Sequence, residues 1–118
     1  MSPHAGKSIY IAGPMRGKPL FNFPAFDAAA ELLRAEGWVV YSPAEADRDN
    51  GFDERGHTGN EPITELVNFD HREAMCNVCE FICMEADAIY MLKGWAHSMG
   101  ARAEWALALA IGLEVIYE

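Results

Sequence analysis

The chain has 118 residues, of which 51% are apolar, so it is long enough to bury one hydrophobic core and too apolar to be disordered throughout. Its formal net charge of −9 gives little attraction for the phosphates of a nucleic acid polymer or for anionic lipid, so we expect neither as a partner. The sequence also lacks an apolar run near the roughly 20 residues of a membrane span and a signal-peptide core, which favours a cytoplasmic location.

Two buried strands are predicted in the first third of the chain. Residues 8–12 (SIYIA) form the first, which ends at Gly13 because the following proline cannot donate into a strand ladder. Asn22 is expected to cap a helix that has a proline in its first turn and stops at Gly37. Residues 38–41 (WVVY) then form the second strand.

The middle of the chain is less regular. Residues 46–61 are polar, rich in glycine and without periodicity, and predict a mobile loop. A loop of this length is usually either a functional lid or disordered, and both alternatives remain open. We expect a long helix over 63–85, a strand at 88–92, an alanine-rich helix over 101–111 and a last strand at 115–117.

The alternation of strands and helices predicts an α/β fold. The expected architecture is a three-layer sandwich around a mostly parallel sheet of four or five strands, of the flavodoxin-like or Rossmann-like type. The whole chain, residues 1–118, is interpreted as one domain. In such a sheet, ligands bind where the carboxyl ends of the strands meet.

The segment from Ser98 to Glu104 carries the strongest candidate site. If a helix starts near Met99, Gly100 and Glu104 lie one turn apart on the same face. Ser98 then takes the N-cap position, where its hydroxyl and the free backbone N–H groups can hold an anion such as a 5′-phosphate. The alternative is an ordinary capped helix with a solvent-exposed glutamate.

The first strand and the turn after it supply further candidates. Gly13, Met15, Arg16 and Gly17 form a glycine-containing turn, where a guanidinium suits phosphate recognition. The alternative for Arg16 is an ordinary surface arginine. Tyr10, inside an otherwise apolar strand, is either a core tyrosine or a residue whose hydroxyl positions a carboxylate.

Three cysteines, Cys76, Cys79 and Cys83, have the spacing of one helix face. They form either a metal or redox cluster or a buried cysteine stripe. The sequence has no second C-x-x-C motif and no paired histidines, which favours the buried stripe. We therefore predict no metal and no cofactor, and an odd number of cysteines argues against a disulfide framework.

Together these features resemble the nucleoside 2-deoxyribosyltransferase-like superfamily over nearly the whole chain. The resemblance rests on residues 9–15 (IYIAGPM), 87–92 (DAIYML) with Gly94-Trp95, and 98–104 (SMGARAE). Within the superfamily, the chain is similar to the small phage-type branch described as a domain of unknown function. It is also similar to the N-glycosidases that act on deoxynucleoside 5′-monophosphates.

The resemblance implies a reaction at a nucleotide. Glu104 would attack C1′ of a deoxyribosyl group and displace the base, Tyr10 would orient Glu104, and water or a second base would resolve the glycosyl-enzyme. Ser98 stands where transferases that act on free nucleosides have an aspartate, which implies a 5′-monophosphate substrate. A homodimer or higher homo-oligomer is also implied, packed through the alanines of the last helix: Ala101, Ala106, Ala108 and Ala110.

One position departs from the superfamily pattern. Its members usually carry an aspartate eight residues before Asp87, where it handles the proton of the leaving base, and here Cys79 takes that place. A thiol is a poor acid at neutral pH. Two hypotheses therefore remain: cleavage or transfer at the N-glycosidic bond of a 2′-deoxynucleoside 5′-monophosphate, or a non-catalytic nucleotide-binding module of the same fold. The identity of the base and the choice between hydrolysis and transfer stay open.

Overall fold

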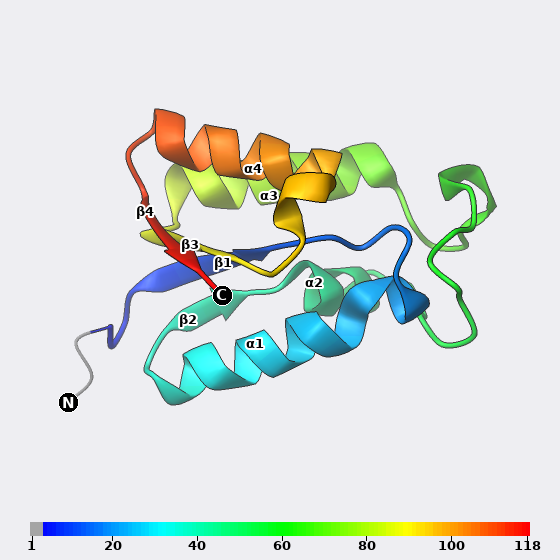
Figure 1. Cartoon of the computed structure of the whole chain (residues 1–118), viewed down its shortest axis with the longest axis horizontal. Coiled ribbons are helices and arrows are strands. Elements are labelled where there is room, and N and C mark those ends of the chain that lie inside the picture. The colour runs from blue at the N-terminus through cyan, green and yellow to red at the C-terminus, as the bar shows by residue number, and fades with distance from the viewer. Residues whose placement is uncertain (1–3) are drawn as a thin grey trace.

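The computed structural model describes residues 4–118, which form a four-stranded, all-parallel sheet between two layers of helices (Figure 1). This confirms the predicted α/β sandwich, and the described residues contain no fifth strand. The first three residues of the polar N-terminal segment lie outside the described part. The strands are β1 (Ser8–Ala12), β2 (Val39–Tyr41), β3 (Ala88–Met91) and β4 (Glu114–Tyr117). The helices are α1 (Phe23–Ala35), α2 (Pro43–Asp49), α3 (His71–Met84) and α4 (Met99–Ala110).

The alternation of side chains along β1 builds one core on each face of the sheet. Ile9 and Ile11 belong to a cluster with side chains of α1 and α2, whereas Tyr10 and Ala12 belong to a cluster with side chains of α3 and α4. Figure 1 shows the two helix pairs on opposite sides of the sheet. Because both faces are covered, β1 and β3 are apolar almost throughout, as expected of central parallel strands.

The strand order β2-β1-β3-β4 places a switch point at the centre of the sheet. The chain leaves β1 toward β2 on one side and returns to β3 on the other, and all pairs are parallel. These are the first four strands of the flavodoxin-like order, in which ligands bind beyond the carboxyl ends of the strands at this point. Among residues 4–118, no helix is both long and apolar enough to cross a membrane.

The predicted loop over 46–61 was wrong at its start, because α2 extends to Asp49. Two arginines fasten this short helix to α1. Arg48 forms paired hydrogen bonds of 2.9 Å with the Asp27 carboxylate, and Arg34 forms two of 2.6 Å with Glu45. The polar residues that suggested a loop therefore serve as connections between two helices.

The long helix predicted from residue 63 was also wrong, since α3 begins at His71. Asn68 has a left-handed backbone conformation, with φ of 59°, which interrupts any helix there. Asp70 then caps α3, because its carboxylate accepts a hydrogen bond of 3.1 Å from the backbone N–H of Glu73. The residues before Asp70 contain a separate short 3₁₀ turn, Ile63–Glu65.

Asn22 does not cap α1 as predicted. Its backbone is left-handed, with φ of 64°, and its side-chain amide donates to the carbonyl of Pro14 at 2.8 Å. Leu20 and Phe21 before it are left-handed as well, with φ of 55° and 52°. Three such residues in a row are costly for side chains with a Cβ, so this kinked segment stores backbone strain next to the turn after β1. The predicted stops of α1 and α4, at Gly37 and Gly112, are in place.

The cysteines do not form the predicted buried stripe. Cys76 and Cys83 are exposed and Cys79 is half-buried, because α3 turns Val78 and Ile82 toward the sheet instead. Within the described residues, no group of three or more histidine, cysteine or acidic side chains is arranged to hold a metal ion.

The alanines of α4 do not share one face either. Ala101 and Ala108 are buried against the sheet, whereas Ala106 and Ala110 are exposed. With 3.6 residues per turn, Ala101 and Ala108 are seven residues apart and lie on the same side of the helix. Ala106 is five residues from Ala101 and therefore lies on a different side.

Residues 50–61, the remainder of the predicted loop, are tied to the segment after β1. The N–H of Gly17 donates to the carbonyl of Gly59 at 2.9 Å, and the N–H of Leu20 donates to the carbonyl of His57 at 3.2 Å. These backbone hydrogen bonds hold the two segments side by side.

We predict that Gly59→Ala destabilises the fold much more than Gly56→Ala. Both glycines have positive φ, 93° and 84°, but a Cβ on Gly59 would lie 1.9 Å from the carbonyl oxygen of Lys18, whereas a Cβ on Gly56 meets nothing within 4 Å. Strain alone should cost Gly56→Ala about 1 kcal/mol, and the added clash should cost Gly59→Ala about 3 kcal/mol or more. Urea unfolding measures both. Equal losses would mean that the two segments do not touch in solution.

Candidate functional site

A cleft of about 600 Å³ opens at the carboxyl ends of the strands. Its lining combines the turn after β1, the start of α2, the first half of α3 and the first turns of α4, which are segments far apart in the sequence. Seven of the eight predicted site residues line it: Tyr10, Gly13, Met15, Arg16, Ser98, Gly100 and Glu104.

Glu104 presents a buried carboxyl group to this cleft. The residue is only 8% exposed, and its Oε2 accepts a hydrogen bond of 3.0 Å from the hydroxyl of Tyr10. Burial raises the pKa of Glu104 to about 7, against the opposing effect of the Tyr10 hydrogen bond. The alternative of a solvent-exposed glutamate is therefore wrong.

Tyr10 remains a hydrogen-bond donor over the whole ordinary pH range. Burial, and then the neighbouring Glu104 carboxyl, raise the pKa of the Tyr10 hydroxyl well above its usual value. Tyr10 is thus both a core residue and the partner that orients a carboxylate, so the two readings of this residue are not exclusive.

The N-terminus of α4 lies beside Glu104 in the cleft. Ser98 caps the helix, since its Oγ accepts a hydrogen bond of 3.2 Å from the N–H of Ala101, as predicted from its position. Gly100 faces open space, because a Cβ there would come no closer than 3.9 Å to the terminal methyl of Met75. The first-turn N–H groups of a helix have no partners within it, so this end can accept an anion.

The turn after β1 contributes a cation to the cleft. Arg16 is exposed and donates one hydrogen bond, of 2.6 Å from Nη2 to the carbonyl oxygen of Glu61, which leaves most of its five N–H donors available. Gly13 allows a close approach to Leu92, the residue after β3, since a Cβ on Gly13 would lie 2.7 Å from the Cβ of Leu92. Gly17 is not among the residues that line the cleft, because its N–H is bonded to the loop over 50–61.

Asp47 on α2 is a second buried carboxyl group in the cleft, and sequence analysis missed it. The residue is 8% exposed, and burial raises its pKa to about 7. Its charge also contributes to the raised pKa values of Tyr10 and Tyr41. The sequence did contain a signal for α2, because Ser42-Pro43 directly follows β2 and proline favours the first turn of a helix. A helix that starts there places Asp47 one turn after Pro43.

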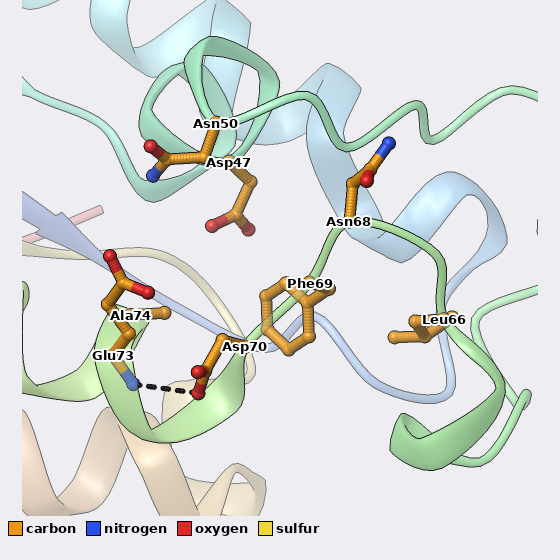
Figure 2. A pocket seen from close by; sticks show the side chains of 8 residues that line it. All are labelled: Asp47, Asn50, Leu66, Asn68, Phe69, Asp70, Glu73 and Ala74. Carbon is orange, nitrogen blue, oxygen red and sulfur yellow. Dashed lines mark hydrogen bonds between the residues drawn. The ribbon is translucent and has the colours of Figure 1, made fainter.

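A smaller hollow of about 480 Å³ adjoins the cleft at Asp47 (Figure 2). In that view the Asp47 carboxyl points into the hollow, opposite the side chains of α3 and of the segment before it. The hollow shares part of its lining with the main cleft, so the two lie side by side. Its lining residues are Asp47, Asn50, Leu66, Asn68, Phe69, Asp70, Glu73 and Ala74.

Cys79, which takes the place of the expected aspartate, is not among the residues that line the cleft. Its neighbours Asn77 and Val78 do line the cleft. Burial, followed by the nearby Glu104 carboxyl, raises the pKa of the Cys79 thiol above its usual value. A thiol in this state gives up its proton even less readily than a free one.

Fold and cleft together define a parallel three-layer α/β protein with a ligand-sized site at the switch point of its sheet. The chain belongs to the family described as domain of unknown function (DUF4406), whose sequence profile matches residues 7–117. No curated protein matches the sequence. Any assignment of activity therefore depends on the chemistry of the cleft.

We predict that Glu104→Gln stabilises the protein, and more so as the pH rises. The pKa of Glu104 is higher in the folded protein, about 7, than its ordinary value of 4.5. Its contribution to stability is thus complete below about pH 4.5 and is lost as the pH rises through 7. Glutamine keeps an oxygen for Tyr10 and does not titrate, so its advantage should grow by on the order of 2 kcal/mol between pH 5 and pH 8.

Thermal unfolding at the two pH values measures this difference, with the exposed Glu80→Gln as the matched control. An advantage for Glu104→Gln that stays constant with pH would show that the Glu104 carboxyl titrates normally in the folded protein.

Proposed function

We propose that this protein cleaves the N-glycosidic bond of a 2′-deoxynucleoside 5′-monophosphate, with Glu104 as the nucleophile and water or a second base as the acceptor. The observation that carries the proposal is the buried carboxyl of Glu104, bonded to Tyr10 inside a ligand-sized cleft. A carboxyl with a strongly raised pKa in a cleft is typical of a catalytic group. The resemblance to the nucleoside 2-deoxyribosyltransferase-like superfamily, in which this glutamate is the nucleophile, supports the same role.

The chemistry follows from the properties of a carboxylate held in this way. In its ionised form Glu104 stabilises the positive charge that develops at C1′ as the base departs, and it then bonds to that carbon. The Tyr10 hydroxyl fixes one carboxylate oxygen, which leaves the other free for the attack. Burial keeps water away from the carboxylate and strengthens its electrostatic effect.

The 5′-phosphate is assigned to the N-terminus of α4. Ser98 and Gly100 offer a hydroxyl, unpartnered backbone N–H groups and open space, and Gly100 lies one turn before Glu104. Arg16 reaches the same cleft from the turn after β1. No other arginine or lysine is among the described residues that line the cleft. Arg16 therefore provides a local positive site for an anion in a protein whose net charge is negative.

The base is assigned to the wall formed by aromatic side chains. Phe21, Phe23, Phe52 and Phe69 all line the cleft. Phe69 is half-buried and offers a flat apolar surface against which a nucleobase can stack, whereas Phe21, Phe23 and Phe52 are at most 5% exposed and pack behind it as core residues. Trp95 lies outside the cleft lining and packs on Trp105, with ring centroids 5.0 Å apart.

We further propose that the protein acts as a homo-oligomer in the cytoplasm, where nucleotide metabolism takes place. Large apolar side chains on and near α4 support association, because Met99, Leu109 and Ile111 are 85%, 48% and 45% exposed. Apolar surface of this kind is common where subunits meet.

A second candidate function is a nucleotide-binding module without catalysis. The observation that favours it is Cys79, a protonated thiol outside the cleft lining at the position where the superfamily has a proton-handling aspartate. The fold and the anion site would then serve binding alone.

We predict that the wild-type protein releases free base from at least one deoxynucleoside 5′-monophosphate and that Glu104→Ala abolishes the release. Loss of the nucleophile should lower the rate by on the order of 10³-fold or more, while binding of the monophosphate is largely kept. Chromatography of a panel of common and modified deoxynucleotides, beside the matching nucleosides, detects the base. The exposed Glu80→Ala serves as the control. Tight binding by calorimetry without release from any substrate would favour the binding module.

We also predict that Arg16→Ala weakens binding of the deoxynucleoside 5′-monophosphate but not binding of the matching nucleoside. Removing a guanidinium that contacts phosphate should raise KM by about 10-fold or more for the monophosphate and leave the matching nucleoside unchanged. Lys18→Ala is the matched control, because Lys18 lies two residues away and is not among the residues that line the cleft. Equal effects of the two variants would indicate general charge attraction in place of a phosphate contact.

A further inference from the structure

We propose that Asp47, and not Cys79, donates the proton to the departing base and later accepts the proton of the attacking water. This inference rests on the proposed function and assigns a residue to a step that the sequence left without one.

The position of Asp47 carries the proposal. Helix α2 follows β2 at the sheet edge that bears the cleft, and Asp47 lines both the cleft and the adjoining hollow (Figure 2). Its side chain is buried, yet its carboxyl oxygens accept no hydrogen bond from any described residue, whereas Glu104 has Tyr10. A buried carboxyl without a partner that points into an open space is prepared to bond to a ligand.

Asp47 is also on the base side of the site. The proposed phosphate ligands belong to α4 and to the turn after β1, while Asp47 shares the hollow with groups suited to a base. The half-buried ring of Phe69 can stack, and the side-chain amide of Asn50 can donate and accept hydrogen bonds, whereas the amide of Asn68 donates to the carbonyl of Gly51 at 3.2 Å. A base held in this hollow would share it with the Asp47 carboxyl.

The surroundings of Asp47 favour its protonated form. Most titratable side chains that share the cleft or the hollow with it are acidic, and the basic ones are Arg16, His71 and His97. Tyr10 and Tyr41 come from the sheet, Glu104 from α4, and Asp70, His71 and Glu73 from the start of α3. Burial raises the pKa of Asp47 to about 7, which is the range in which a carboxyl group serves as an acid at neutral pH.

The proton balance of the two steps is complete with these groups. In the first, the Glu104 carboxylate forms a bond to C1′ as the C1′–N bond breaks. The electron pair of that bond passes to the base, and the base leaves neutral after it takes the proton of Asp47. In the second, water attacks C1′ and gives one proton to the Asp47 carboxylate, and the C1′–O bond to Glu104 breaks. The products are free base and 2-deoxyribose 5-phosphate, and both carboxyl groups return to their starting states.

The test compares two leaving groups in Asp47→Asn. With a deoxynucleoside 5′-monophosphate, kcat/KM should fall on the order of 10²- to 10⁴-fold. With 2-deoxyribose 5-phosphate that carries p-nitrophenolate at C1′, which needs no proton to depart, the first step should change by about threefold or less, seen as the burst of nitrophenolate. The fall of the wild-type pH profile above about pH 7 should be absent in Asp47→Asn.

Two further variants keep the test decisive. Asp49→Asn, an exposed carboxyl on the same helix, should leave both substrates unchanged. Asp47→Glu retains an acid and should recover part of the rate with the natural substrate, which a merely structural role would not predict. Thermal unfolding of each variant shows whether it is folded.

The outcomes separate this inference from the proposed function. If Asp47→Asn slows both leaving groups equally, or if the alkaline fall of the profile persists in it, Asp47 is not the proton donor although the activity stands. If the wild-type protein releases neither base nor nitrophenolate, the proposed function fails, and the role of Asp47 fails with it.

Discussion

The hydrogen bond between Tyr10 and Glu104 connects the central strand β1 to helix α4, whose first turns line the cleft. A carboxyl group at this depth is an expensive way to fill space, because an apolar side chain of similar size would pack there without loss of hydration. One neutral donor compensates only part of that cost, as the raised pKa of Glu104 shows. Burial of this kind lowers stability at neutral pH, and such losses are commonly found where a protein needs a reactive group.

Around that bond the structure separates three chemical environments within one cleft. The N-terminus of α4 and Arg16 provide positive potential, the phenylalanines provide an apolar wall, and Asp47 with the adjoining hollow provides acidic and amide groups. Such a division suits a ligand that has an anion, a ring system and a reactive centre between them. The positive groups are local to the cleft, whereas the chain as a whole has a net charge of −9.

The sequence predicted the parts of this site that depend on local signals. Strand β1 and the capped start of α4 were visible in apolar runs, glycines and Ser98. Helix α2 was missed because seven residues give little periodicity and polar side chains dominate their composition. Asp47 could not be recognised as buried for a further reason. Its surroundings come from elements distant in the sequence, since residues of β1, α3 and α4 line the cleft with it.

The order of the strands has a consequence for how the molecule reaches its native state. Strand β1 is central, but on one side it pairs with β3, residues 9–12 with residues 88–91. That side of β1 therefore stays open until the first 91 of the 118 residues are present. The bond to Glu104 spans 94 residues. Long-range parallel pairing slows folding and leaves a strand edge open in the meantime. During synthesis the N-terminal β-α-β unit therefore emerges with an unpaired edge, and the cleft is complete only after α4 docks.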